Sequence, residues 1–123
     1  MTIEYRAVRF ANEGYRVGSD GSVWSRKNAR WGLRADYVQM KTNPDSGGYQ
    51  TLKLMVGRKG VTFRVNVIVL RAFIGDAIEG HESCHNNGDP WDCRLTNLRW
   101  DTRRANIADA QRHGTMRVAK HGD

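Results

Sequence analysis

Residues 82–114, ESCHNNGDPWDCRLTNLRWDTRRANIADAQRHG, constrain the fold of this chain more than any other stretch. They join a Cys-His pair, a loop containing Gly88 and Pro90, a short apolar-basic run and a helical pattern that ends at Gly114. Glycine and proline exclude regular structure through the loop, so the segments on either side of it must be separate elements. The order of extended arm, loop, short strand and helix predicts a ββα unit.

Local signals set the bounds of each element in this unit. Residues 81–86 are predicted to be an extended arm, and residues 95–100 a short strand. Thr102 is a suitable helix N-cap, because its hydroxyl can accept a hydrogen bond from an otherwise unpaired backbone N–H. Residues 103–113 are then predicted to be helical, and Gly114 ends the helix as a C′ residue.

A second helix is predicted immediately before this unit, ending near Gly75. Apolar residues recur there with the i, i+3, i+4, i+7, i+8 spacing of one helical face. They are Val65, Ile68, Val69, Ala72 and Phe73. Nothing in this segment suggests chemistry, so we expect its role to be structural.

The first 64 residues are predicted to be rich in β-strand. Alternating runs flank turns that contain glycine. The predicted hairpins pair residues 15–17 with 22–24 around the turn 18–21, and residues 48–55 with 61–65 around the turn 57–60. Residues 42–48 form a loop by composition, and the basic stretch 26–41 is predicted as a loop or irregular strand, either solvated or resting on phosphates.

Together these elements predict an α+β fold, in which a ββα unit follows an N-terminal β-hairpin module and one short helix. We divide the chain into a β-rich module over residues 1–64, the helix and ββα unit over residues 65–115, and a loose tail over residues 116–123. A length of 123 residues suits one small domain with a modest core.

Charge narrows the class of partner. Lys and Arg total 20 against 13 acidic residues, a net charge of +7, which favours a polyanion such as nucleic acid. No apolar run follows Met1 and none is long enough to span a membrane, so we expect a cytoplasmic protein without membrane partners. Cys84 and Cys93 are accordingly expected to be reduced thiols.

Three polar residues of the key stretch, spaced H-x11-N-x8-N, form a candidate site for hydrolysis of phosphodiester bonds. His85 is the candidate general base, because imidazole titrates near neutral pH. Asn97 is placed to brace the loop by bonding its backbone. Asn106, in the first turns of the helix, offers an amide oxygen to a hard divalent cation, and Asp109 lies one turn further along the same face.

These motifs closely resemble the HNH endonucleases of bacteriophages and mobile introns. The resemblance covers residues 65–115, through the NGDP loop, the NLRWDT run and a helix that opens R-x-AN-x-x-D. The preceding YRVGSDGSVWS and GGYQTLKL also look like the small β module found before HNH motifs in homing endonucleases. The resemblance implies a ββα-metal active site that cleaves double-stranded DNA in a bacterial host, in a phage-encoded monomer or homodimer.

Roles carry over residue by residue. His85 matches the general base, Asn97 the middle structural position and Asn106 the metal ligand on the helix. The position before the base is Asp or His in relatives but Cys84 here, and a thiol is a poor ligand for Mg²⁺. Asp109 is therefore the candidate substitute. The implied cofactor is one Mg²⁺ or Mn²⁺, with Ni²⁺ or Zn²⁺ as alternatives, and the implied products carry 5′-phosphate and 3′-hydroxyl ends.

Basic side chains near the site and in the N-terminal module are the candidate DNA contacts. Those within the ββα unit are Arg94, Arg99, Arg103 and Arg104, and those before it are Arg26, Lys27, Arg30, Arg58 and Lys59. The alternative function is a non-catalytic DNA-binding module stabilised by zinc, because two His and two Cys form a ligand set that zinc accepts. That set is His81, Cys84, His85 and Cys93.

Overall fold

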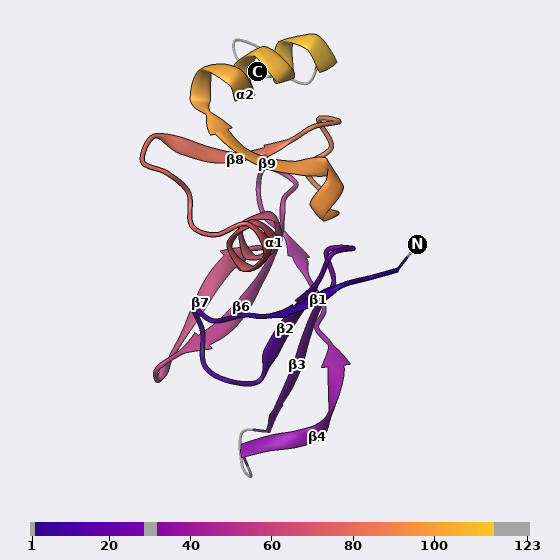
Figure 1. The fold of residues 1–123 in the computed structure, drawn as a ribbon, viewed down its shortest axis with the longest axis vertical. Helices are drawn as coiled ribbons and strands as arrows, with labels where there is room; N and C mark the ends of the chain where they lie inside the picture. Colours follow the sequence, from indigo (N-terminus) through magenta and orange to yellow (C-terminus); the bar gives the residue numbers. More distant parts are fainter. Residues whose placement is uncertain (1, 29–31, 115–123) are drawn as a thin grey trace.

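The computed structural model describes residues 2–28 and 32–114 of the chain. The described part contains three antiparallel sheets and two α-helices (Figure 1), which confirms the predicted α+β class. The first sheet has the order β1-β2-β3-β4, formed by Tyr5–Ala7, Tyr15–Gly18, Val23–Asn28 and Gly32–Gln39. The second has the order β5-β6-β7, formed by Asn43–Pro44, Gln50–Val56 and Lys59–Arg64. The third pairs β8 (His81–His85) with β9 (Leu98–Thr102).

The predicted hairpin around residues 18–21 is confirmed by the pairing of β2 with β3. The basic stretch that follows is more regular than the sequence indicated. Here β3 continues to Asn28 and pairs with β4, with a register shift between Ser25 and Lys27. Most of β4 is exposed, so this edge strand lacks the apolar alternation by which a half-buried strand is recognised.

The second predicted hairpin, β6–β7, is also confirmed. Val56 pairs with Lys59, which leaves Gly57 and Arg58 as the turn, and Gly57 adopts a φ of 64°. Leu52 and Leu54 of β6 point into the core. The segment predicted as a loop contains one short paired stretch, β5, where Pro44 is tolerated because it lies on a sheet edge.

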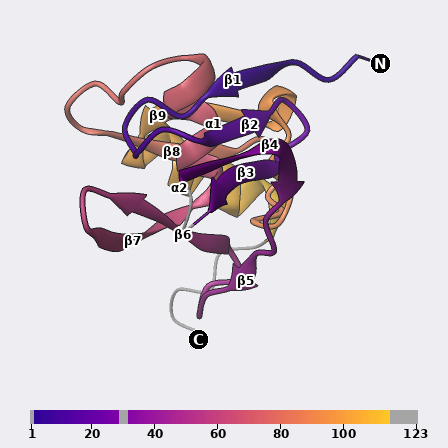
Figure 2. The same ribbon diagram turned by 90° about the horizontal axis from the view of Figure 1, so that it is seen from below.

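Helix α1, Val65–Phe73, lies between the two larger sheets and the β8–β9 hairpin (Figures 1 and 2). The predicted helix is thus confirmed. Its residues Val65, Ile68, Val69 and Leu70 are completely buried and pack with Val17, Val23, Leu54 and Leu98 in one core cluster. Buried Asn66 of α1 donates a 2.7 Å hydrogen bond to Ser83 Oγ, which attaches strand β8 to the helix.

The ββα unit is completed by helix α2, Arg103–His113. Thr102 Oγ1 accepts a hydrogen bond from Ala105 N at 3.2 Å, and Gly114 follows the helix with a φ of 68°. Both predicted caps are confirmed. The predicted strand over residues 95–100 is wrong in its first half, because Leu95–Asn97 forms a 3₁₀ turn and β9 begins at Leu98.

The N-terminal sheet reaches the ββα unit directly. Leu95 N donates to Ser19 O at 2.9 Å, so the β2–β3 turn fixes the start of the 3₁₀ turn. In the same turn, Gly21 has a φ of 90°, and a Cβ built on it would lie 2.9 Å from Cys93 O. The division of the chain at residue 64 stays a prediction, and the tail over residues 116–123 lies outside the described residues.

Candidate active site

His85 ends strand β8 and is 8% exposed, against the ring of Tyr49 at a centroid distance of 5.6 Å. Its Nε2 is buried and has no hydrogen-bond partner among the described residues. Burial lowers the pKa of His85, Asp89 and Asp92 raise it, and Arg64 lowers it again, with a net decrease below the ordinary value. The imidazole is therefore neutral at neutral pH, which is the form that can accept a proton.

Asn97 holds the loop that follows His85. Its Oδ1 accepts from Asn87 N at 2.9 Å, while its Nδ2 donates to Asn87 Oδ1 and to Asp92 O, each at 3.0 Å. Asn86 N donates to Asn97 O at 2.7 Å. The Asn97 side chain is 95% buried, and these are the bonds that the predicted bracing role would require.

An ion pair between Asp92 and Arg94 also stabilises this loop. Asp92 accepts bonds of 2.8 and 2.7 Å from the Arg94 guanidinium and one of 2.8 Å from Asn87 Nδ2. The hydrogen bonds from Arg94 are the main reason that the pKa of Asp92 falls to about 2. Arg94 was predicted to contact DNA, and in the structure its guanidinium binds Asp92 while its side chain is 60% exposed.

Helix α2 carries the two residues predicted to hold a cation. Asn106 is half-buried, and its carboxamide has no hydrogen-bond partner among the described residues. Asp109 is 4% exposed, and its carboxylate binds Arg99 at 2.5 Å and also Arg112. Two guanidinium groups already neutralise this carboxylate, so as a metal ligand Asp109 would have to give up an ion pair.

Cys84 is completely buried in β8. It pairs with Arg99 across the hairpin and so shares its face, which is the face bound to α2 through Asp109. Burial raises the pKa of the Cys84 thiol, and Sγ donates to Glu82 O at 3.6 Å. A neutral thiol does not fit Mg²⁺, whereas the unpaired carboxamide of Asn106 does, with water and phosphate as the remaining ligands.

The residues of the zinc alternative do not form one site. No group of three or more His, Cys, Asp or Glu side chains in residues 2–28 and 32–114 is placed to hold a metal ion. Both cysteines are free thiols, and Cys93 lies in the main core, where burial raises its pKa to about 12. Cys84 and His85 point to opposite faces of their strand, as neighbours in a strand do.

The predicted DNA contacts differ in how many partners they have within the protein. Arg99 is the most engaged, because its guanidinium binds Asn86 and Asp101 in addition to Asp109. Four are exposed, two at the start of α2 and two at the tip of the β6–β7 hairpin, and the structure gives them no salt bridge to another described residue. These are Arg103, Arg104, Arg58 and Lys59.

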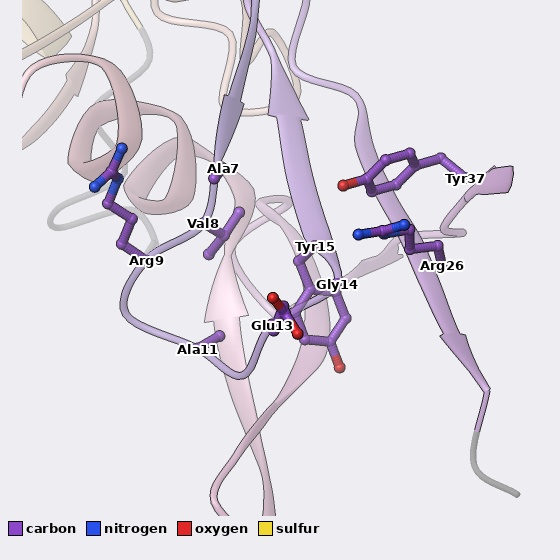
Figure 3. Close-up of a pocket in the computed structure, with 9 residues that line it drawn as sticks. All are labelled: Ala7, Val8, Arg9, Ala11, Glu13, Gly14, Tyr15, Arg26 and Tyr37. Carbon is purple, nitrogen blue, oxygen red and sulfur yellow. The ribbon is translucent and has the colours of Figure 1, made fainter. Parts of the chain in front are cut away.

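Arg26 and Lys27 lie in β3, in the N-terminal sheet. Arg26 lines a pocket with Glu13, Gly14 and Tyr37 (Figure 3), and its guanidinium lies 5.6 Å from the Tyr37 ring centroid. His85, Asn97 and Asn106 do not line this pocket. Arg30 lies outside the described residues.

Two neighbours of His85 were not identified from the sequence, namely Tyr49 and Arg64. Tyr49 precedes β6 and Arg64 ends β7, and the Arg64 guanidinium carbon lies 4.0 Å from the Tyr49 ring centroid. Because their proximity to His85 depends on how the second sheet packs beside the ββα unit, no spacing in the sequence could have revealed it.

Known proteins with similar sequences and structures include HNH endonucleases. Residues 64–108 match the HNH endonuclease family. The DNA endonuclease I-HmuI of Bacillus phage SP01 is 29% identical over 118 residues, which are 96% of this chain and 63% of that protein. A solved structure described as "DNA binding and cleavage by the HNH homing endonuclease I-HmuI" matches with a TM-score of 0.75 and 28% identity, covering 97% of this chain and 64% of that chain.

The chain thus spans less than two thirds of the length of the relatives that it matches. No described helix is both long and apolar enough to cross a membrane. The family match over residues 64–108 and the similarity to I-HmuI in sequence and in structure confirm the resemblance to HNH endonucleases that was drawn from the motifs.

Proposed function

We propose that this protein is a metal-dependent DNA endonuclease that hydrolyses phosphodiester bonds with His85 as the general base. The observation that carries the proposal is the state of His85. Burial keeps its imidazole neutral, and the Asn97 bonds fix the loop that begins one residue later. A neutral, positioned imidazole is what activation of a water nucleophile requires.

In this reaction His85 accepts a proton from water, and the resulting hydroxide attacks the phosphorus in line with the 3′-oxygen. The bond from phosphorus to that oxygen breaks, and the leaving oxygen takes up a proton from solvent water, which gives 5′-phosphate and 3′-hydroxyl ends. Asn97 acts as a positioning residue, because its amide bonds reach Asn87 and Asp92 rather than the reacting atoms.

A divalent cation, Mg²⁺ or Mn²⁺, with Ni²⁺ or Zn²⁺ as alternatives, would be held by the Asn106 carboxamide together with water and the DNA phosphate. When bound, the cation offsets the charge that develops on the phosphate and on the leaving oxygen. Cys84 is a weaker candidate as a neutral thiol, and Asp109 would need to release Arg99 or Arg112.

Double-stranded DNA is the proposed substrate, and the exposed arginines at the start of α2 are its proposed contacts near the site. Arg103 and Arg104 lie where the positive end of the helix dipole already attracts phosphate. Arg58, Lys59, Arg26 and Lys27 would extend the contact over the N-terminal sheets. A monomer has one such site and would nick one strand, whereas cutting both strands would need a homodimer or two events.

The test is conversion of supercoiled plasmid to nicked circles in Mg²⁺, Mn²⁺, Ni²⁺ or Zn²⁺, with EDTA as the blank. His85→Ala should lower the rate about 10²- to 10⁴-fold, the contribution of a general base, while DNA binding persists. His81→Ala is the matched control, since it removes another histidine of β8 and should keep most of the activity.

Undiminished nicking by His85→Ala would overturn the proposal. Wild-type protein that binds DNA and never nicks it in any of these metals would instead support the non-catalytic DNA-binding alternative.

A further inference from the structure

The side chains of His85, Tyr49 and Arg64 come together from three segments of the chain. The Tyr49 ring lies 5.6 Å from the His85 ring, with an interplanar angle of 48°. The Arg64 guanidinium carbon lies 4.0 Å from the Tyr49 ring centroid, a stacking distance. The influence of Arg64 on the pKa of His85 also indicates that its charge is close to the imidazole.

Arg64 is held in this place by its inner nitrogen. Its Nε donates to Asp45 Oδ2 at 3.0 Å, and Asp45 Oδ1 accepts from Gly47 N and Tyr49 N at 2.8 and 3.1 Å. The turn that carries Tyr49 therefore also carries the carboxylate that orients Arg64. The two terminal nitrogens of Arg64 have no hydrogen-bond partner in the described part of the chain, and its side chain is 48% exposed.

A phosphate that approaches His85 also meets acidic groups. Asp89 and Asp92 both act on the imidazole, and the charge of Asp92 is compensated by its ion pair with Arg94. Arg99, the arginine of strand β9, is already bound to Asp101 and Asp109. Arg64 combines proximity to the base with terminal nitrogens that are available for a ligand.

We propose that Arg64 is a phosphate-binding residue of the nuclease site, which uses its two terminal nitrogens to hold a backbone phosphate of DNA beside His85. The planar guanidinium suits two oxygens of one phosphate, and stacking on Tyr49 fixes its plane before DNA arrives. The inference rests on the proposed function, and it makes the second sheet a contributor to the active site.

The chain offers a matched control in Arg71 of helix α1. Its guanidinium carbon lies 3.8 Å from the Phe10 ring centroid, and its Nε binds Asp76 Oδ1 at 2.9 Å. Arg71 thus shares the stacking and the carboxylate partner of Arg64, but the structure shows no contact between Arg71 or Phe10 and His85. Any effect peculiar to Arg64 must then come from its position.

The experiment measures the affinity of the full chain for a short DNA duplex by fluorescence anisotropy in EDTA, at several salt concentrations. Arg64→Met should weaken binding and reduce the slope of log K against log salt by about 0.9, the value for one lost phosphate contact on duplex DNA. Arg64→Lys should recover most of the slope, and Arg71→Met should keep all of it.

Nicking by the same variants gives a second readout. Arg64→Met should lower kcat/KM about 10- to 100-fold, as expected for one lost charge-assisted contact, while its Tm stays near that of Arg71→Met. An unchanged salt slope and unchanged nicking in Arg64→Met would overturn the inference. So would an equal loss in Arg71→Met.

If Arg64→Met does not fold, Arg64→Gln replaces it and is compared with Arg64→Lys. A larger salt slope for Lys than for Gln supports the phosphate contact, and equal slopes refute it. Because the binding assay contains no metal and involves no cleavage, it decides the role of Arg64 separately. Failure of wild-type nicking would count against the proposed function, not against this contact.

Discussion

The β8–β9 hairpin is held differently at its two sides. At the loop that follows His85, the main fixing group is a neutral amide, Asn97, which bonds backbone and side-chain partners. Toward helix α2, the fixing groups are charged, with Arg99 between Asn86, Asp101 and Asp109. Hydrogen bonds between neutral amides are little affected by salt, whereas ion pairs are weakened by it. His85, the proposed general base, thus lies on the side where the main support is less sensitive to salt.

The largest effect is expected from Asn97→Ala, which removes the amide that holds the loop after His85. The substitution removes three side-chain bonds at a buried position and leaves their partners unpaired, at a cost of about 2 to 4 kcal/mol in unfolding free energy. Nicking should fall about 100-fold at temperatures where the variant is still folded, because the loop after His85 loses its brace. Urea unfolding and the plasmid assay measure the two effects.

Asn12→Ala is the matched control for that variant. Its carboxamide also bridges a turn, donating to Gly57 O and accepting from Gly57 N, each at 2.8 Å, but at the β6–β7 tip. It should lower stability with little change in kcat. An equal drop in kcat for both variants would show that general destabilisation, and not the brace, explains the Asn97 result.

The charged side is tested by Arg99→Met, which leaves the buried Asp109 carboxylate with Arg112 alone. We expect a loss of about 1 to 3 kcal/mol in unfolding free energy that shrinks in high salt. The double variant Arg99→Met/Asp109→Leu should regain part of the loss, because no buried charge is then left without its partner. Additive losses in this cycle would show that the two side chains are not coupled.

Cys84→Asp tests whether position 84 can hold a metal ion, because it places a carboxylate on the side of the hairpin that faces α2, next to Arg99. Since the resemblance to HNH endonucleases implies Asp or His at this position, we expect Mn²⁺ to raise the Tm of the variant by a few degrees more than that of the wild-type protein. Cys84→Ser, which adds no charge, should show no such gain. An identical response to Mn²⁺ in all three proteins would exclude position 84 as a ligand site.

The smallest expected effect is on the free energy of unfolding at low pH. Because the pKa of Asp92 in the folded protein is about 2, below its unfolded value of 3.8, its ionised form stabilises the fold. That contribution, on the order of 1 to 2 kcal/mol before screening at the exposed Arg94, is fully present above about pH 4 and is lost as pH falls toward 2. Asp92→Asn should therefore have a flatter stability profile between pH 4 and 2, measured by urea unfolding.

Features that depend on residues close together in the sequence could be predicted, whereas features that depend on distant residues could not. Both helices and the caps of α2 depend on neighbours within a few residues, and both helices were predicted. The bounds of α2 are those predicted, whereas α1 ends at Phe73, shortly before the predicted stop at Gly75. Strand β4 was predicted only as a loop or irregular strand because, as an exposed edge strand, it carries no apolar alternation. The motif gave His85, Asn97 and Asn106 as candidates through their spacing.

The remaining features of the site depend on packing between distant segments. The contact of Tyr49 with His85, and the stacking of Arg64 on Tyr49, require the second sheet to lie beside the ββα unit. Arg99 was assigned to DNA as an arginine beside the motif, but its ion pair with Asp109 depends on the rotation of α2 about its axis. Neither relation follows from local periodicity.

The packing of Gly21 against Cys93 has a consequence for variation in this protein. A single methyl group at position 21 would meet the Cys93 carbonyl at 2.9 Å and would also strain a backbone with a φ of 90°. The displaced segment would be the one that leads from Asp92 to Asn97. A mutation in the N-terminal turn would therefore alter the loop that follows His85. Gly21→Ala is therefore expected to make the loop after His85 sensitive to temperature while leaving the proposed catalytic residues unchanged.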